Sequence, residues 1–389
     1  MNDTWDDLVR ELAPLGEKVL ARAPQDITPQ ARMELYRSLA NGFALGAVRL
    51  TYDDPDYPCF YPHLNEVFNF AAPVPDFVYQ TASVRGEGIY RLSGYRGTTR
   101  FVDVNFRSGP FRYGVPGNPA ARIDLDDLTR DASGYFSVIL SQKRPAGHRG
   151  NWAAMPADTT RLMVRHAACD WLHEVDARLA IERLDVPAAQ PRMPAAAIAA
   201  RMAKLAEWAE DQVSYWLGHV ATIRQRGVIN RVERHDYSTL GGAAGQVYFE
   251  GLYELAPGEA LIVETDVPDT CRYWSVMVTD EHFGTIDWIN HQSSINDVQA
   301  RRDADGKFRA VVSPEDPGIA NWLDTAGRTR GALQFRWNNS SSVPDLHVRK
   351  VNLAALAGEL PADTARTTPA QRDRILRERR EGAQLRRRW

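Results

Sequence analysis

Two stretches that lie far apart in the chain share one pattern: Gly134-Tyr-Phe-Ser-Val-Ile-Leu-Ser141 and Gly306-Lys-Phe-Arg-Ala-Val-Val-Ser313. In each, a glycine precedes an apolar run that ends in serine, which is typical of a β-strand leaving a turn. Each stretch is followed by an Asn-Trp pair and then by an apolar residue with arginine: Asn151-Trp152 with Val164-Arg165, and Asn321-Trp322 with Phe335-Arg336. Similarity between distant segments indicates that one unit occurs twice. We therefore predict an internal duplication of a β-sandwich.

The other segments predict helices. Apolar residues recur at helical spacing within 4–22, Thr28-Pro29 forms a helix start, and the longest helical pattern covers 195–225. A capping box at 368–371 starts a helical tail. The predicted class is α+β: two jelly-roll-like antiparallel β-sandwich lobes with an N-terminal helical segment, a long inter-lobe helix and a C-terminal helical tail. The predicted divisions are 1–75 (helical), 76–186 (first lobe), 187–230 (linker and long helix), 231–355 (second lobe) and 356–389 (basic tail).

Charge and composition exclude several classes of protein. The 389 residues carry a formal net charge of −3, which argues against a dedicated nucleic-acid binder. The three cysteines are too few and too scattered for a disulfide framework, which fits a reducing compartment. The start of the chain lacks the pattern of a signal peptide, and no run of about 18 apolar residues predicts a membrane span. We expect a cytoplasmic protein.

Several motifs resemble the bacterial family catalogued as domain of unknown function 1214. The most specific is Asp316-Pro-Gly-Ile-Ala-Asn-Trp-Leu-Asp-Thr-Ala-Gly327, and Arg272-Tyr-Trp-Ser275 supports it. Pro75-Asp76 and Gly150-Asn-Trp152 are similar to the β lobe that precedes this module in long members, so the resemblance covers nearly the whole chain. Arg328 departs from the pattern, where we expect a histidine in relatives. The resemblance implies β lobes with helices, and it brings no reaction with it.

The densest polar cluster lies between residues 280 and 297, interleaved with aromatic residues. Carboxylates beside imidazoles in a semi-apolar pocket suit general acid–base chemistry. If the strand ending at Val278 continues, Asp280 and His282 share one face and form a pair. The predicted catalytic residues are Tyr273, Asp280, His282, Asp287 and His291. The alternative is a solvated connection between strands.

A second set of residues is predicted to bind substrate, and we expect a pocket at the aromatic seam between the lobes. These residues are Trp288, Asn296, Asn321, Asp324 and Arg336. Arg336 either orients the polar end of a ligand or pairs with Asp324 to fix the fold. The Asn-Trp pairs equally suit a structural role, with the tryptophan in a core and the asparagine holding a loop.

A metal site is an alternative interpretation. Its candidate ligands are His282, His291 and His347 with Asp280 or Asp287, although no compact histidine signature is present. The cofactor stays open between none, iron and haem, and the absence of Cys-x-x-Cys-His excludes covalent c-type haem. Four histidines within strand or helix patterns are interpreted as structural or surface residues: His148, His166, His173 and His219.

The leading functional hypothesis is an enzyme that acts on a hydrophobic small molecule of terpenoid, steroid or aromatic type in catabolism. Acid–base hydration or dehydration, a lyase-type reaction, suits the predicted residues. One alternative is an iron- or haem-dependent oxygenase of an alkene or aromatic substrate, and another is a non-catalytic protein that binds a carbohydrate or lipid-like ligand. The expected partner is the hydrophobic small molecule, without nucleic acid or a membrane span. The tail, with eight arginines from Arg372 to Arg388, is a candidate contact for a homo-oligomer.

Overall fold

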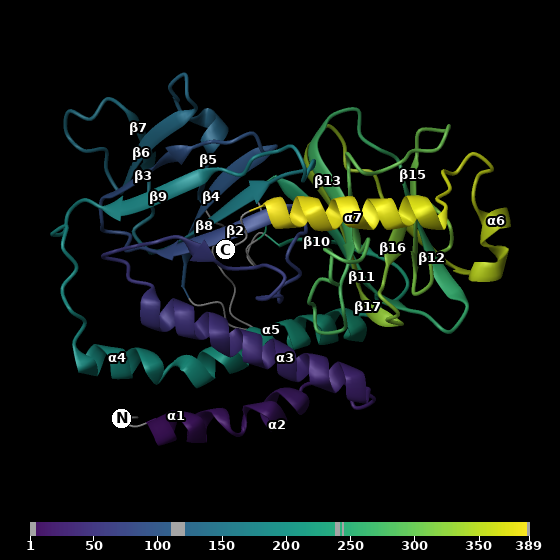
Figure 1. Ribbon diagram of the computed structural model, residues 1–389, viewed down its shortest axis with the longest axis horizontal. Helices are drawn as coiled ribbons and strands as arrows, with labels where there is room; N and C mark the ends of the chain where they lie inside the picture. The colour runs from purple at the N-terminus through teal and green to yellow at the C-terminus, as the bar shows by residue number, and fades with distance from the viewer. Residues whose placement is uncertain (1–4, 110–120, 238–241, 243–244, 387–389) are drawn as a thin grey trace.

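The chain folds into two β lobes that lie side by side, with helices along one side of both (Figure 1). The computed structural model describes residues 5–109, 121–237, 242 and 245–386. Each lobe contains one five-stranded and one four-stranded sheet. The α+β class and the two β lobes predicted from the sequence are therefore confirmed.

Within the described residues, nine strands form the first lobe: β1 Tyr61–Pro62, β2 Phe77–Ser83, β3 Tyr90–Tyr95, β4 Phe101–Ser108, β5 Arg122–Asp124, β6 Tyr135–Ser141, β7 Asn151–Ala154, β8 Thr159–Ala167 and β9 Arg178–Arg183. The five-stranded sheet has the order β1-β2-β8-β4-β5, and the four-stranded sheet has the order β7-β6-β3-β9. The pair β6–β7 is parallel, and the other pairs are antiparallel.

The part of the chain that the structure describes contains nine more strands in the second lobe: β10 Glu233–His235, β11 Gln246–Glu254, β12 Glu259–Thr265, β13 Cys271–Val278, β14 Ser294–Asn296, β15 Phe308–Ser313, β16 Trp322–Asp324, β17 Arg330–Ser340 and β18 His347–Asn352. Their sheets have the orders β10-β11-β17-β13-β14 and β16-β15-β12-β18. Adding nine to each strand number of the first lobe gives these orders, and β15–β16 is again the parallel pair. The two lobes thus repeat one topology.

The repeat extends to single residues. Tyr79 of β2 lies opposite Arg165 of β8, and Tyr248 of β11 lies opposite Arg336 of β17. The arginines that the sequence pattern placed in equivalent positions therefore occupy the same point of equivalent sheets. This register supplies a residue-by-residue correspondence between the lobes.

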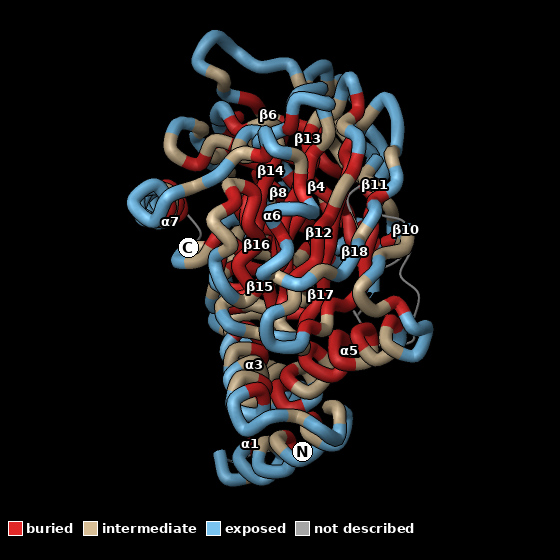
Figure 2. The backbone as a smooth tube through the Cα atoms, turned by 90° about the vertical axis from the view of Figure 1, so that its right-hand side faces the viewer, coloured by how far each residue is buried: buried red, intermediate tan, exposed pale blue. Residues whose placement is uncertain are grey.

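Each five-stranded sheet is buried on both faces (Figure 2). Because side chains alternate along a strand, Val102 and Val104 of β4 enter the core of the first lobe, where they pack with residues of β6. Phe101 lies on the opposite face and joins a core shared with Tyr273 of the second lobe. Trp274 of β13 points instead into the core of the second lobe. The two five-stranded sheets thus pack toward each other between two outer four-stranded sheets.

Five helices lie along one side of the lobes: α1 Trp5–Leu12, α2 Leu15–Leu20, α3 Pro29–Ala47, α4 Ala195–Met202 and α5 Leu205–Gln225. The Thr28 hydroxyl accepts a hydrogen bond from the Ala31 amide, as predicted for this helix start. A π-helix, Val48–Tyr52, continues α3. The long helical segment of 195–225 is divided into α4 and α5, and the buried residues Tyr215 and Trp216 of α5 join the core between the lobes. Within the described part of the chain, no helix combines the length and apolarity needed to cross a membrane.

The C-terminal segment contains α6 Leu356–Glu359 and α7 Pro369–Leu385. The predicted capping box at Thr368 is present at the start of α7, which crosses both lobes (Figure 1). Arg372, Arg379 and Arg386 are buried within the chain itself. Their spacing of seven residues, about two helical turns, places them along one side of the segment. This side is buried against the rest of the chain, so the homo-oligomer contact predicted for the tail would have to use another side.

Candidate functional site

A pocket lies between the five-stranded sheets of the two lobes and beside α5. It holds about 820 Å³ of space free of protein atoms, including its open mouth. Apolar and aromatic side chains form much of its wall: Phe70, Val74, Phe77, Trp208, Trp216 and Phe283. We call it the inter-lobe pocket. Its position matches the prediction of a pocket at the aromatic seam between the lobes.

Arginines line the same pocket on the side of the first lobe. Arg161 and Arg165 lie on β8 with one residue of the same face between them, and Arg107 lies on the neighbouring strand β4. Arg49 of the π-helix acts electrostatically on Arg161 from behind the wall. All three wall arginines are buried. We call the four residues the arginine cluster.

The arginine cluster is poorly neutralised. Arg107 Nη1 and Arg161 Nε are buried without a hydrogen-bond acceptor among the described residues. Asp103 Oδ2 lies 3.6 Å from Arg165 Nη1. Asp53 also acts on Arg161, but its carboxylate already accepts hydrogen bonds from the Tyr61 hydroxyl and the Ser83 amide.

Burial and mutual repulsion destabilise the charged forms of these groups. Burial, followed by the charge of Arg165, lowers the pKa of Arg107 to about 10. Burial also lowers the pKa of Arg161 well below its usual value, and the charges of Arg49 and Arg107 add to this effect. His63 lies in the same environment, where burial and then Arg161 lower its pKa well below the usual value. The wall therefore combines neutral imidazole with concentrated positive charge.

The two sides of the pocket are related by the repeat. His63 donates its amide to the Tyr79 carbonyl, and His235 is the register partner of Tyr248. The Arg165 guanidinium lies 6.0 Å from the centre of the Tyr79 ring, and that of Arg336 lies 5.7 Å from the Tyr248 ring. A His-Tyr-Arg set thus occurs once on each lobe.

Other equivalent positions have diverged. Arg161 of the first lobe corresponds to Ala332 of the second, so the cationic wall is confined to the first lobe. Thr81 corresponds to Glu250, so the second lobe carries a buried carboxylate instead. The two lobes therefore differ in charge around the pocket: the first contributes arginines, and the second contributes a buried carboxylate.

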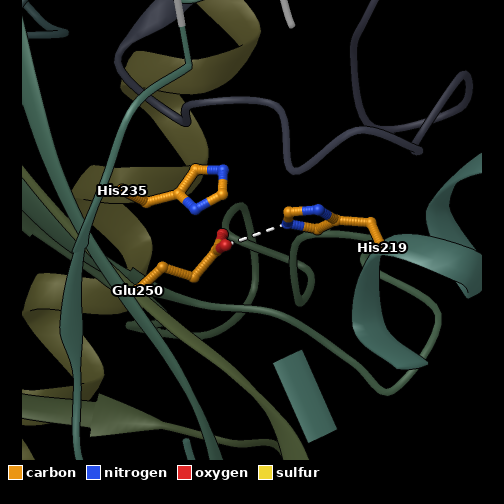
Figure 3. Close-up of side chains that lie close together, drawn as sticks. All are labelled: His219, His235 and Glu250. Atoms are coloured by element: carbon orange, nitrogen blue, oxygen red, sulfur yellow. Dashed lines mark hydrogen bonds and ion pairs between the residues drawn. The ribbon is translucent and has the colours of Figure 1, made fainter. Parts of the chain in front are cut away.

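On the second lobe, two histidines converge on Glu250 (Figure 3). His219 comes from α5, His235 from β10 and Glu250 from β11. One ligand atom from each of these residues lies within 4.8 Å of the other two. His219 Nε2 lies 2.8 Å from Glu250 Oε2 and 2.9 Å from the Tyr237 hydroxyl, which itself donates to Glu250 Oε1. We call His219, His235 and Glu250 the His–Glu cluster.

The His–Glu cluster holds defined protonation states. Burial works against the charge of Glu250, but His219 and the hydrogen bond from Tyr237 hold the pKa of this carboxyl below its usual value. Burial and the adjacent Glu250 raise the pKa of Tyr237 well above its usual value. Burial lowers the pKa of His235. At neutral pH the cluster therefore contains a carboxylate, a phenol and a neutral imidazole.

Gln334 joins the His–Glu cluster to the pocket arginine of the same lobe. Its Nε2 donates to Glu250 Oε1 at 2.9 Å and to the Tyr237 hydroxyl at 3.2 Å. Its Oε1 accepts a hydrogen bond from Arg336 Nη2. Tyr237, Gln334 and Arg336 all line the inter-lobe pocket. A ligand in the pocket thus meets the edge of this network.

Arg336 is the one residue of the predicted site that lines the inter-lobe pocket. Tyr273 and Asn296 lie deeper, where each donates to the buried carboxylate of Asp76 at 2.7 Å. The Tyr273 hydroxyl also lies 2.7 Å from Ser275 Oγ, which is 3.4 Å from Arg336 Nη1. Tyr273 is therefore linked to the pocket wall through one serine.

Four of the other predicted residues line a different feature, an open groove beside α3. Asp280, Asp287, Trp288 and His291 contribute to this groove. The expected pairing of Asp280 with His282 does not form, because Asp280 Oδ1 accepts the backbone amides of His282 and Gly284 in a turn. The carboxylate thus closes the turn.

The remaining predicted residues have local partners. Asn321 holds a loop through the backbone of Arg301 and Arg309, which is the structural role considered for it. Asp324 Oδ2 lies 2.7 Å from His291 Nδ1, and Arg336 instead contacts Ser275 and Gln334. The alternative pairing of Asp324 with Arg336 is therefore not observed.

The histidines proposed from sequence as metal ligands do not converge. Within the described residues, the group of three or more potential ligands is His219, His235 and Glu250, and it contains none of them. A helical pattern favours a structural role for His219, and nothing in the sequence around His235 and Glu250 marks them as site residues. The repeated arginine pattern was the signal that pointed toward the pocket wall.

The chain is similar to other proteins in sequence and in structure. Residues 259–341 match the family described as "Protein of unknown function (DUF1214)", which confirms the resemblance seen in the sequence. An uncharacterized protein from Burkholderia cenocepacia has a similar solved structure, with a TM-score of 0.84 and 29% identity over 91% of this chain and 98% of that chain. A protein from Vibrio parahaemolyticus matches 81% of this chain and 99% of its own with 12% identity and a TM-score of 0.44. No curated protein sequence matches the chain.

Proposed function

We propose that the chain binds an amphipathic organic anion in the inter-lobe pocket. The observation that carries this proposal is the set of buried Arg107 and Arg161 nitrogens that meet no acceptor among the described residues. A buried charge without a partner is costly, and an anionic head group would supply the missing acceptors.

The apolar part of the wall supports a hydrophobic body on the same ligand. Phe77, Trp208 and Phe283 offer aromatic surface beside the cationic wall. Small-molecule sites commonly combine an apolar lining with a few convergent polar groups. The ligand class that fits is a carboxylate of aromatic, terpenoid or steroid type.

Calorimetric titration tests the proposal with 2-naphthoate and its neutral analogue 2-naphthalenemethanol. We expect the carboxylate to bind more tightly, and Arg161→Met to weaken its binding about 10- to 100-fold, because hydrogen bonds to charged groups contribute about 1.5–3 kcal/mol. Arg377→Met is the matched control, since Arg377 is an exposed residue of α7 paired with Asp373. Equal binding of the alcohol, or unchanged carboxylate binding by Arg161→Met, would overturn the proposal.

An acid–base enzyme is the second candidate, favoured by the hydrogen bond between Tyr237 and Glu250 at the edge of the same pocket. In the hydration of an alkene, the Glu250 carboxylate would take a proton from water while the water oxygen bonds to one carbon of the alkene. Tyr237 would deliver a proton to the other carbon, and transfer from Glu250 to Tyr237 would restore both groups. This is the lyase-type chemistry expected from the sequence, assigned to different residues.

Cinnamate tests the enzyme, because it combines an aromatic body, an alkene and a carboxylate. Mass spectrometry in ¹⁸O-water would detect the hydrated product, and Tyr237→Phe is expected to abolish turnover while retaining binding. Binding of cinnamate without turnover would favour the non-catalytic alternative, a lipid-like ligand carrier. Turnover that survives Tyr237→Phe would remove Tyr237 from the mechanism.

Cytoplasmic location and self-association through α7 stay predictions from the sequence. The buried face of α7 already contacts both lobes, so a second copy would have to use the opposite face, which includes Arg377. Size-exclusion chromatography of Arg377→Glu against the unmodified chain would test that contact.

A further inference from the structure

The His–Glu cluster has the composition of a metal site. Two imidazoles and one carboxylate are a ligand set that proteins use for zinc and for non-haem iron(II), with positions left open for water or substrate. We propose that His219, His235 and Glu250 together bind one divalent transition-metal ion. This proposal rests on a different group of residues from the arginine cluster and stands independently of anion binding.

The geometry requires only small adjustments. Ligands about 2.0–2.2 Å from a metal ion lie roughly 3–3.5 Å from one another in a tetrahedral or octahedral site. His219 Nε2 and Glu250 Oε2 are 2.8 Å apart, and one atom from each of the three residues lies within 4.8 Å of the others. The rings of both histidines approach the carboxylate from different elements, as Figure 3 shows. An ion between them would replace the direct contact of His219 with Glu250.

His235 supplies an independent observation. Its Nε2 is buried and has no hydrogen-bond partner among the described residues, although the ring lies beside a carboxylate. A buried imidazole nitrogen without a partner needs an explanation, and a missing ion is one of those that apply.

The carboxylate ligand is held in place from outside the cluster. Tyr237 and Gln334 both donate to Glu250 Oε1, which leaves Oε2 directed at His219. Hydrogen bonds of this kind orient metal ligands and tune their affinity. Because Gln334 also accepts from Arg336, the ion would lie one hydrogen-bonded residue from the pocket arginine of the second lobe.

The repeat explains why one such site is expected instead of two. His63 corresponds to His235, but Thr81 occupies the position of Glu250. The first lobe therefore lacks the carboxylate ligand at this point, and arginines surround its histidine instead. Positive charge would repel a cation there.

Metal-depleted full-length protein tests the proposal by calorimetric titration with Zn²⁺ and, under anaerobic conditions, with Fe²⁺. Co²⁺ serves as the spectroscopic probe of ligation by histidine. We expect one ion per chain, and His235→Ala and Glu250→Gln are each expected to weaken binding at least about 100-fold. The matched control is His291→Ala, which removes a half-exposed histidine that pairs with Asp324 and should leave binding unchanged.

Circular dichroism checks that each variant is folded, and Glu250→Gln preserves the size of the side chain. If neither variant folds, the unmodified protein decides, because Co²⁺ bound by two imidazoles produces a visible absorption band. Failure of the unmodified chain to bind a stoichiometric ion would overturn the proposal, as would equal affinity in the folded variants. Loss of metal binding in His291→Ala alone would place the site in the groove beside α3. Naphthoate binding is measured separately, so the two proposals fail independently.

Discussion

A buried arginine is informative when its partners are missing. Arg161 and Arg386 are both buried, but Arg386 is paired with Asp176 and donates to the carbonyls of Asp76 and His166. Arg161 Nε has no acceptor among the described residues, and after burial the charges with the largest effect on the pKa of Arg161 are those of Arg49 and Arg107. The paired arrangement of Arg386 stabilises the fold. The unpaired nitrogen of Arg161 costs free energy in the ligand-free protein, and a bound anion would reduce that cost.

Arg161→Met is therefore expected to stabilise the ligand-free protein while weakening anion binding. Replacing a poorly paired buried ion by an apolar side chain of similar length is expected to raise the free energy of unfolding by about 1–2 kcal/mol. Urea denaturation monitored by circular dichroism measures this change. A loss of stability would show that Arg161 has a structural partner and would remove it from the binding site.

His63 gives a prediction about pH. Its pKa is lowered in the folded state by burial and by Arg161, whereas the unfolded chain titrates near pH 6.5. Below about pH 6.5 the unfolded state therefore takes up a proton that the folded state does not, so this contribution to stability is lost as the pH falls toward the folded-state pKa. His63→Gln should lose less stability than the unmodified protein between pH 7 and pH 5 in denaturant titrations. Parallel curves for the two proteins would contradict the burial of a neutral His63.

At the residue scale, the sequence indicated individual polar residues better than it indicated which of them meet in space. Arg336, which the repeated pattern marks, lines the pocket wall. His291 meets the carboxylate of Asp324, a pairing that the sequence did not predict. His219 and Glu250 escaped notice because they are 31 residues apart and meet only when α5 packs against β11. Spacing along the chain carries no information about such a contact.

At the scale of elements, the asparagine of each Asn-Trp pair connects a loop to a strand by the same set of hydrogen bonds in both lobes. Asn151 bonds to the backbone of Thr129 and Ser137, and Asn321 bonds to the backbone of Arg301 and Arg309. Each asparagine thus ties a preceding loop to the first strand of a parallel pair. Asn321 is buried, whereas Asn151 is only partly so.

Removing these amides should therefore have unequal effects. Asn321→Ala is expected to lower the free energy of unfolding by about 2–4 kcal/mol, since it leaves buried backbone groups without partners. Asn151→Ala should cost about 1 kcal/mol, because water can reach the released groups. Chemical denaturation of the two variants side by side measures the difference. Equal losses in the free energy of unfolding would show that burial does not change the contribution of the two asparagines.

The helix α7 connects the two lobes of the same chain. Arg379 donates to the Trp288 carbonyl and to Ser294, and its guanidinium lies 4.7 Å from the centre of the Trp171 ring. Trp288 and Ser294 belong to the second lobe, whereas Trp171 follows the last long strand of the first. One arginine of α7 therefore contacts both lobes. The sequence predicted the helix and its cap, but the charge of the tail gave no indication of which face would be buried.

Arg386→Met should destabilise the protein by about 3–5 kcal/mol, because it leaves the largely buried Asp176 without its cation. Arg377→Met provides the control within the same segment, since its ion pair with Asp373 is exposed and should contribute less than about 0.5 kcal/mol. Thermal unfolding of both variants tests the contrast. Similar melting temperatures for the two would mean that α7 does not fasten the lobes.

At the scale of the whole molecule, two copies of one β unit face each other across a pocket that neither forms alone. The repeated pattern in the sequence predicted the lobes because each strand and turn is specified locally. The pattern did not predict which faces of the sheets meet between the lobes. The five-stranded sheets are buried on both sides, so the sequences of their strands do not distinguish one face from the other. The divergence of Arg161 from Ala332 and of Glu250 from Thr81 becomes meaningful only when the strands are superposed through their register.

Because the pocket is built from both lobes and α5, its ligand should stabilise the folded chain as a whole. Binding to the folded state alone raises the free energy of unfolding by about 2.7 kcal/mol when the free ligand is at 100 times its dissociation constant. We expect 2-naphthoate to produce a rise of this size in urea denaturation of the unmodified protein, and the alcohol to produce much less. Arg161→Met, with binding weakened about 10- to 100-fold, should show a smaller rise of about 0.4–1.4 kcal/mol at the same ligand concentration, even though its ligand-free stability is higher. A ligand that binds at the surface of one lobe without contacting the arginine cluster would stabilise both proteins equally, and that result would separate surface binding from occupation of the inter-lobe pocket.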